Sequence, residues 1–263
     1  MKPWEGYLEP FKIFGNLYFV GTTFVSSHII DTGDGLILID SQYPQSLYLL
    51  LENIRALGFD PADIKYILHS HGHYDHIGGT RAIVELYGNA KTVIGRQDRD
   101  YVNGTLDLTW AKELGHKYFE MFEPDILLDD GDTLKLGNTE IKCINTPGHT
   151  PGVMSFFFDV TDGERILRAG MFGGGGMNSM KLSFLDKYSL PHSLRDDFLV
   201  SLDKVYNERV DIIVGNHPGD SKIAEKYPLY KAGDKDIYVD SCAWKKRLDL
   251  YRQTHAKMVE SGE

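Results

Sequence analysis

Residues 65–79 read KYILHSHGHYDHIGG, and they decide the fold. Four side chains that can bind a metal, His71, His73, Asp75 and His76, fall within six residues directly after an apolar run. Zn²⁺ needs several nitrogen or oxygen donors that converge on one point. If a strand here turns into a helix, the first two histidines point one way and the Asp-His pair points another. One short loop then serves two neighbouring metals, and this spacing disfavours the alternative of a polar turn with incidental histidines.

Two more histidines occupy similar positions. His149 lies in the turn NTPGHTPG after a predicted strand over residues 139–145, and His217 lies in GNHPG after the apolar run 210–214. Each follows the end of a strand, in a loop rich in Pro and Gly. Together with the first loop, these positions predict two further metal ligands.

The other histidines have no ligand partner at short spacing, and we interpret them as structural. His69 is expected to point off the opposite face of its strand from the ligands. The remaining members of this set are His28, His116, His192 and His255.

The pattern of apolar residues predicts alternating sheets and helices. A hairpin over 11–20, strands at 26–31, 36–40 and 65–68, and helices at 44–57 and 80–87 come first. Residues 96–120 look helical and irregular, and they can pass over the site. Further strands are expected at 125–129, 133–136, 139–145, 153–160, 165–168 and 210–214, with helices at 193–206, from 221 and at 238–259. This order gives two sheets flanked by helices in a single domain over 1–263.

Composition restricts the function classes. The net charge of −10 repels polyanions such as nucleic acid, so we expect a small-molecule substrate and no nucleic-acid partner. Two cysteines, Cys143 and Cys242, make no disulfide framework. No stretch is long and apolar enough to span a bilayer, and residues 1–10 have no apolar signal region. A cytoplasmic protein is therefore expected, unless a signal peptide was removed before this numbering begins.

These motifs, in this order and spacing, resemble those of the metallo-β-lactamase superfamily over nearly the whole chain. The stretches 10–22 and 53–59 are similar to the β-lactamase subclass whose second zinc is held by Asp and two His, with no cysteine ligand. The resemblance implies an α/β fold, the αββα four-layer sandwich, with the metals at one edge. It assigns one zinc to His71, His73 and His149. It assigns the other to Asp75, His76 and His217.

The chemistry follows from these residues. Two Zn²⁺ ions a few Å apart can share a water and lower its pKa, which predicts a binuclear hydrolase that uses a metal-bound hydroxide on a lactam, lactone or thioester carbonyl. Asp75 is the candidate catalytic residue, because it can ligate a metal and orient the nucleophile. Two alternatives remain: a phosphodiesterase or nuclease of the same superfamily, and a metal-binding protein with vestigial activity.

Residues 165–176 depart from the family pattern. Many relatives bridge their metals with an Asp after this strand, whereas Met171 stands there, and a thioether is a poor Zn²⁺ ligand. The resembling lactamases carry small hydroxyl residues where this chain has Met171 and Gly173, which predicts weak turnover of β-lactams. The run Gly173–Gly176 lacks a P-loop Lys-Ser/Thr and a clear following helix, so we interpret it as a mobile rim loop. Met171, Met177 and Met180 could form an adaptable apolar wall for the substrate.

Overall fold

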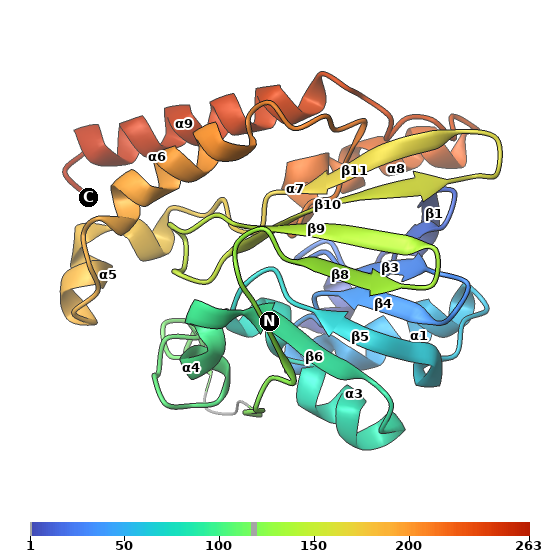
Figure 1. The fold of residues 1–263 in the computed structure, drawn as a ribbon, viewed down its shortest axis with the longest axis horizontal. Coiled ribbons are helices and arrows are strands. Elements are labelled where there is room, and N and C mark those ends of the chain that lie inside the picture. The colour runs from blue at the N-terminus through green and yellow to red at the C-terminus, as the bar shows by residue number, and fades with distance from the viewer. Residues whose placement is uncertain (1, 117–119) are drawn as a thin grey trace.

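Two β-sheets pack face to face between layers of helices in the computed structural model, which describes residues 2–116 and 120–263 (Figure 1). The first sheet has seven strands in the order of the chain, antiparallel from β1 to β4 and parallel from β4 to β7. Its strands are β1 (Phe11–Phe14), β2 (Leu17–Phe19), β3 (His28–Asp31), β4 (Leu36–Ile39), β5 (Ile64–Leu68), β6 (Lys91–Gly95) and β7 (Ile126–Leu128).

The second sheet has five strands in the order β12-β11-β10-β9-β8. All neighbours are antiparallel except β11 and β12, which are parallel. Its strands are β8 (Thr133–Leu136), β9 (Thr139–Asn145), β10 (Met154–Thr161), β11 (Ile166–Met171) and β12 (Ile212–Ile213).

Helices cover the outer face of each sheet. In Figure 1, α1 and α3 lie below the first sheet, and α6 and α9 lie above the second. No helix in the described ranges is long and apolar enough to cross a membrane. The helices are α1 (Leu47–Ala56), α2 (Tyr74–Ile77), α3 (Thr80–Tyr87), α4 (Arg99–Val102), α5 (Leu182–Lys187), α6 (Leu194–Val205), α7 (Pro218–Ser221), α8 (Ile223–Lys231) and α9 (Ala243–Glu260).

Strands buried on both faces produce this layering. Successive side chains of a strand point to opposite faces, so a continuous apolar run supplies two cores at once. In β4, Ile37 packs between the sheets, whereas Leu38 packs against α1 and α3. In β10, Phe156 likewise enters the inter-sheet core, and Phe157 packs against α6 and α9. The αββα sandwich is therefore confirmed, with its largest core between the two sheets.

Three local differences separate the structure from the prediction. No strand was assigned to 91–95, yet β6 lies there in the parallel part of the first sheet. Helix α5 was also missed, because six residues give too little periodicity to recognise. The last helix begins at Ala243 and not near Tyr238, because Val239 pairs with Ile212 in an isolated bridge.

The strand ends that matter for function lie at one edge of the sandwich. The parallel strands β4, β5 and β6 end there together, as parallel strands must. In the second sheet, β9, β11 and β12 run in one direction, because β10 is antiparallel to both β9 and β11. Loops at the carboxyl ends of such strands are where α/β folds place their binding sites. Every ligand predicted from the sequence lies in one of these loops or on the short helix α2 that follows β5.

We expect Phe156→Ala to lower the free energy of unfolding by about 3–5 kcal/mol, because it removes a fully buried ring from the inter-sheet core. Urea denaturation of the metal-loaded protein measures this. The control is Val200→Ala on α6, where the side chain is 64% exposed and the expected change is within about 0.5 kcal/mol. Equal losses in the two variants would contradict the assignment of the core.

Candidate metal centre

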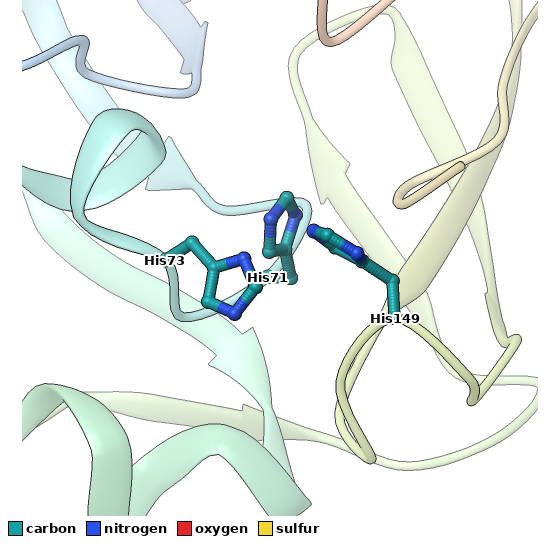
Figure 2. Close-up of side chains that lie close together, drawn as sticks. All are labelled: His71, His73 and His149. Carbon is teal, nitrogen blue, oxygen red and sulfur yellow. The ribbon is translucent and has the colours of Figure 1, made fainter. Parts of the chain in front are cut away.

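Three buried histidines from two loops converge on one point. His71 and His73 follow β5, and His149 follows β9. Their ring centroids lie 4.5–4.7 Å apart, and one ligand atom from each ring lies within 4.8 Å of the others. Figure 2 shows the rings facing a common space, with His71 and His73 on one side and His149 on the other. The first predicted group is therefore assembled.

The second group joins the same loop to the end of the second sheet. Asp75 and His76 lie on the single turn of α2, which redirects the chain after His73, the residue that precedes this helix. His217 follows β12 and precedes α7. Asp75 Oδ2 lies 3.2 Å from His76 Nε2 and 3.4 Å from His217 Nε2.

The two groups are neighbours. The ring centroids of His71, in the first group, and His76, in the second, are only 4.3 Å apart. The change from extended backbone at His73 to helix at Tyr74 separates the two pairs of side chains, as the sequence indicates. Two adjacent sets of three ligands result, each with an Asp or His donor set that suits zinc.

Unpaired buried nitrogens support metal binding at both groups. His71 Nε2 and His76 Nε2 are buried and make no well-formed hydrogen bond among the described residues, and the nearest carboxylate oxygen to His76 Nε2 is that of its fellow ligand Asp75, at 3.2 Å. A buried polar atom without a partner costs about 1–3 kcal/mol, so native structures rarely tolerate two of them side by side. A metal ion would satisfy both. The residues present therefore fit the two-zinc site that the fold family implies.

Burial gives the first group the protonation state that a metal requires. It lowers the pKa of His71 and His73 well below the ordinary value, and that of His149 to about 4. These rings are therefore neutral, with a lone pair available, at physiological pH.

The second group has a different electrostatic character. Burial alone would lower the pKa of His76, but the carboxylates of Asp75 and Asp40 outweigh it and raise that pKa to about 10. Burial would raise the pKa of Asp75, but His76 and His217 hold it well below its ordinary value. Without metal, the second group therefore holds a proton that a metal ion must displace.

Backbone carbonyls from one glycine-rich loop fix two ligands of the first group. His71 Nδ1 lies 2.9 Å from the carbonyl oxygen of Gly173, and His149 Nδ1 lies 2.8 Å from that of Gly176. Each Nδ1–H donates to its carbonyl, which leaves Nε2 as the nitrogen with a free lone pair. The loop thereby selects the tautomer that directs Nε2 at the metal.

Asp40 performs the same task in the second group. Its Oδ2 accepts from His76 Nδ1 at 2.8 Å, and its two oxygens also accept from the backbone N–H and the hydroxyl of Ser70. His217 Nδ1 lies 3.2 Å from the carbonyl oxygen of Phe24. Asp40 is wholly buried at the end of β4 and has a φ of 56°, a left-handed conformation that costs a non-glycine residue about 1–3 kcal/mol. The sequence analysis missed this residue, although an Asp directly after a buried strand was a usable signal.

The glycine run 173–176 is only partly the rim loop that we predicted, because Gly175 and Gly176 line the cavity beside the metal groups but the first half of the run is a support for the ligands. Its first two residues are buried, and its carbonyls hold the ligands described above. A Cβ on Gly174 or Gly176 would lie 3.0 or 2.9 Å from atoms of His149, so glycine lets the backbone approach the ring. Two short helical segments, Asn178–Met180 and α5, follow the loop, contrary to the prediction that none would.

The proposed methionine wall is also wrong. Met171 and Met180 have no exposed surface and pack in separate hydrophobic cores. Met177 packs against the core beside α6 and α9. None of the three lines the cavity beside the metal groups. Met171 nevertheless supplies no oxygen donor, so each group has three protein ligands.

The five histidines interpreted as structural belong to neither group. His69 is buried and bonds the carbonyl oxygen of Val93 at 2.9 Å and the Thr80 hydroxyl at 2.7 Å, so it anchors β5 to β6 and α3. Burial lowers its pKa to about 4. These contacts confirm that it faces away from the ligands.

A buried carboxylate ties the two ligand loops of the first group together. Asp98 accepts from the backbone N–H of Gly72 at 2.8 Å, from the hydroxyl of Thr150 at 2.6 Å and from the backbone N–H of Gly152 at 2.7 Å. Gly72 lies between two ligands, and Thr150 directly follows the third. Asp98 therefore fixes the distance between loops that are far apart in the sequence, and sequence spacing gave no sign of this.

A cavity of about 220 Å³ lies beside both groups. Four of the six ligands reach it, together with glycines of the 173–176 run. Trp110 and Leu114 of the predicted segment 96–120 contribute to it, and residues 117–119 of that segment lie outside the described residues. Its other side chains are aromatic, aliphatic or amide, namely Tyr43, Trp110, Leu114, Asn178 and Asn216.

Comparison with known proteins places this geometry in a family. A family model described as the metallo-beta-lactamase superfamily matches residues 20–217. The chain belongs to that superfamily. The prediction of a metallo-β-lactamase-like protein is thus confirmed at the level of family, fold and paired metal groups.

Solved structures of subclass B3 metallo-beta-lactamases are similar over the whole fold. BJP-1 of Bradyrhizobium japonicum has a TM-score of 0.87 at 30% identity, over 100% of this chain and 99% of that one. The class B3 di-zinc enzyme LRA-12 from an Alaskan soil metagenome has a TM-score of 0.82 at 28% identity, over 98% and 97%.

Curated relatives match a shorter stretch. The N-acyl homoserine lactonase AttM of Agrobacterium fabrum is 29% identical over 123 residues, which is 44% of each chain. The chain spans about half the length of the curated relatives it matches.

We expect about two zinc ions per chain after saturation and gel filtration, because each group offers three ligands. His149→Ala and His217→Ala should each lower this to about one, by removing one ligand from one group. Elemental analysis measures the content. His192→Ala is the control, since that side chain is exposed and pairs with Asp186. Two zinc ions retained in both ligand variants would show that these residues do not hold the metals.

Asp40→Asn should weaken second-site zinc binding by about 10- to 100-fold, because the amide removes the charge that orients His76. Competition with a chromophoric chelator measures the stepwise affinities. Asp186→Asn, at an exposed carboxylate, serves as the matched control and should leave both affinities unchanged. A loss of zinc affinity at the first site alone would show that Asp40 supports the first group and not the second.

Proposed function

We propose that the protein is a binuclear zinc-dependent hydrolase that acts on the carbonyl of a lactam, lactone or thioester. One observation carries the proposal: two adjacent three-ligand groups open on a single small cavity with an apolar wall. Paired metal sites of this kind serve hydrolysis, and an apolar wall holds the acyl part of a substrate next to them. The di-zinc β-lactamase neighbour and the lactonase relative support this class of reaction.

Zinc ions bound at the two groups would supply Lewis acidity, which polarises a substrate carbonyl and lowers the pKa of water. The protein groups around the centre hold the metal ligands in position. Carbonyl and carboxylate acceptors hold four of the ligand imidazoles at Nδ1, so the centre does not have to reorganise during the reaction.

Asp75 is the residue best placed to orient the attacking water. It belongs to the second group, and it also lines the cavity. Its low pKa keeps the carboxylate ionised, so it can accept a hydrogen bond from the water and fix the direction of attack. Tyr43 lines the same cavity, and burial raises the pKa of its hydroxyl above the ordinary value. That hydroxyl therefore remains a donor to a substrate oxygen.

The cavity favours a substrate without an anionic group beside the reacting carbonyl. No Lys or Arg lines it among the described residues, and its polar side chains away from the ligands are neutral, namely Tyr43, Trp110, Asn178 and Asn216. Asn216 already donates to the carbonyl oxygen of Gly173 at 2.7 Å. A carboxylate buried against this wall would lose hydration without a cationic side chain in return. Neutral lactones and thioesters therefore fit better than β-lactam drugs, which carry a carboxylate.

The alternatives have less support. A nuclease needs cationic side chains along the phosphate backbone, and this chain has a net charge of −10 and no described Lys or Arg in the cavity. A metal-binding protein with vestigial activity differs from an enzyme in turnover alone. Activity measurements separate these possibilities.

Asp75→Ala should lower kcat/KM by about 100-fold or more, since it removes a ligand and the group that orients water. Hydrolysis of a chromogenic ester or lactone by the zinc-loaded protein measures this, and a chelator should abolish the activity. Asp186→Ala is the control for loss of a carboxylate and should retain full activity. A zinc-loaded protein that turns over none of these substrates would identify a metal-binding protein and not a hydrolase.

A neutral lactone should be hydrolysed with a kcat/KM at least about tenfold above that of a carboxylate-bearing cephalosporin, a difference of about 1.4 kcal/mol in transition-state binding. Parallel steady-state assays of the wild-type protein test this. The methyl ester of the same cephalosporin is the matched control, and its kcat/KM should rise toward that of the lactone. A preference for the free acid would contradict the account of the cavity wall.

A further inference from the structure

A second cavity, of about 320 Å³, lies between α9 and the segment formed by α7 and α8. It shares no lining residue with the cavity at the metal groups. Its volume is at the lower end of the range for small-molecule sites. Four cationic side chains line it, in a chain whose net charge is −10, and these are Lys222, Lys226, Lys246 and Arg247.

The two carboxylates that line the cavity are already engaged by the protein. Asp220 accepts from the hydroxyl of Tyr251 at 2.6 Å and from the backbone N–H of His217 at 3.2 Å. Asp240 accepts from the backbone N–H of Cys242 at 2.9 Å. These neutral donors leave the carboxylate charges in place, so part of the cationic lining is balanced: Asp220 lies 3.6 Å from Arg247, and Asp240 lies near Lys226. Four cationic side chains face two carboxylates in the lining, which leaves a net positive charge.

Two of the lysines make no ion pair with any residue in the described ranges. Lys246 is exposed beside the cavity, and Lys226 is half-buried, with its Nζ 5.7 Å from the ring centroid of Tyr238. Burial lowers the pKa of Lys226 more than the nearby carboxylate of Asp240 raises it. A partly desolvated ammonium group with no carboxylate in ion-pair contact is unfavourable unless a ligand supplies the counter-charge.

The remaining lining is apolar apart from two hydroxyls, and that of Tyr238 already donates to the carbonyl oxygen of Ile223 at 3.4 Å. Ile213, Tyr238, Ala243 and Leu250 form a wall next to the lysines. Ser221 is 7% exposed, and its Oγ has no hydrogen-bond partner among the described residues. By turning about χ1, this hydroxyl can donate to an acceptor placed in the cavity.

We propose that this cavity binds a small organic anion that has one anionic group and an apolar body about the size of one ring. Lys226 and Lys246 pair with the anionic group, and the wall of Ile213 and Leu250 covers the apolar body. Neither lysine contacts a metal ligand in the structure. The site is therefore separate from the proposed hydrolytic centre.

The probe for this proposal is phenylphosphonate, which has an aromatic ring and an anionic head and cannot be hydrolysed. Titration calorimetry of the zinc-loaded protein should detect saturable binding at this cavity. The double variant Lys226→Met/Lys246→Met keeps the apolar stems and removes both charges, so the affinity should fall at least about tenfold. Lys245→Met is the matched control, because Lys245 adjoins Lys246 but pairs with Asn207 outside the cavity, and it should bind like wild type.

A footprint on the wild-type protein tests the site without substitutions. Acetic anhydride labels accessible lysines, and mass spectrometry should show that phenylphosphonate protects Lys226 and Lys246 but not Lys245. Wild-type affinity in the double variant, or an absence of protection, would place the anion at the zinc ions and overturn the proposal. Absence of any binding at millimolar phenylphosphonate would overturn it as well. Because these readouts do not measure turnover, failure of the hydrolase proposal leaves them unaffected.

Discussion

The metal centre depends on how its imidazoles are held. Four ligand histidines have Nδ1 within hydrogen-bond distance of an acceptor, three on backbone carbonyl oxygens and one on Asp40. This leaves Nε2 of each ring as the coordinating atom and fixes the plane of the ring. The acceptors come from the loop between β2 and β3, from the end of β4 and from the loop after β11, so the sandwich must be assembled before the ligands can converge. In this protein the geometry of the metal site therefore depends on the complete fold.

The metal centre also requires that the backbone of residues 173–176 lies close to His149. The run 173–176 passes so near His149 that a Cβ on Gly174 or Gly176 would lie only 3.0 or 2.9 Å from an atom of this residue. Asp98 joins the loop of His71 and His73 to the loop of His149 from the other side. The centre thus sits between two supports, one made of glycine backbone and one of a buried carboxylate. Both supports contain buried residues, namely Asp98 in one and Gly173 and Gly174 in the other.

The sequence predicted the ligands because they are local. Four of them fall within six residues, and the other two follow strands whose apolar runs are easy to recognise. The supports could not be predicted in the same way. Asp40 acts on His76 across 36 positions, and Gly173 acts on His71 across 102, so only the tertiary structure brings them together.

The predictions that were wrong failed for the same reason, because they depended on contacts between residues far apart in the sequence. A glycine-rich run looks mobile when its neighbours are unknown, and Met171 looks available to substrate until β11 is extended to include it in the core. Strand β6 was missed because two polar residues begin its five-residue run, and its burial in the parallel sheet overrides that weak local pattern.

The most direct test of the account is a crystal structure of the zinc-loaded protein with an anomalous difference map at the zinc edge. Two peaks roughly 3.5–4 Å apart are expected. One should contact His71, His73 and His149, and the other should contact Asp75, His76 and His217. A single peak, or a peak held by residues outside these two groups, would contradict the claim that the two groups hold a pair of zinc ions.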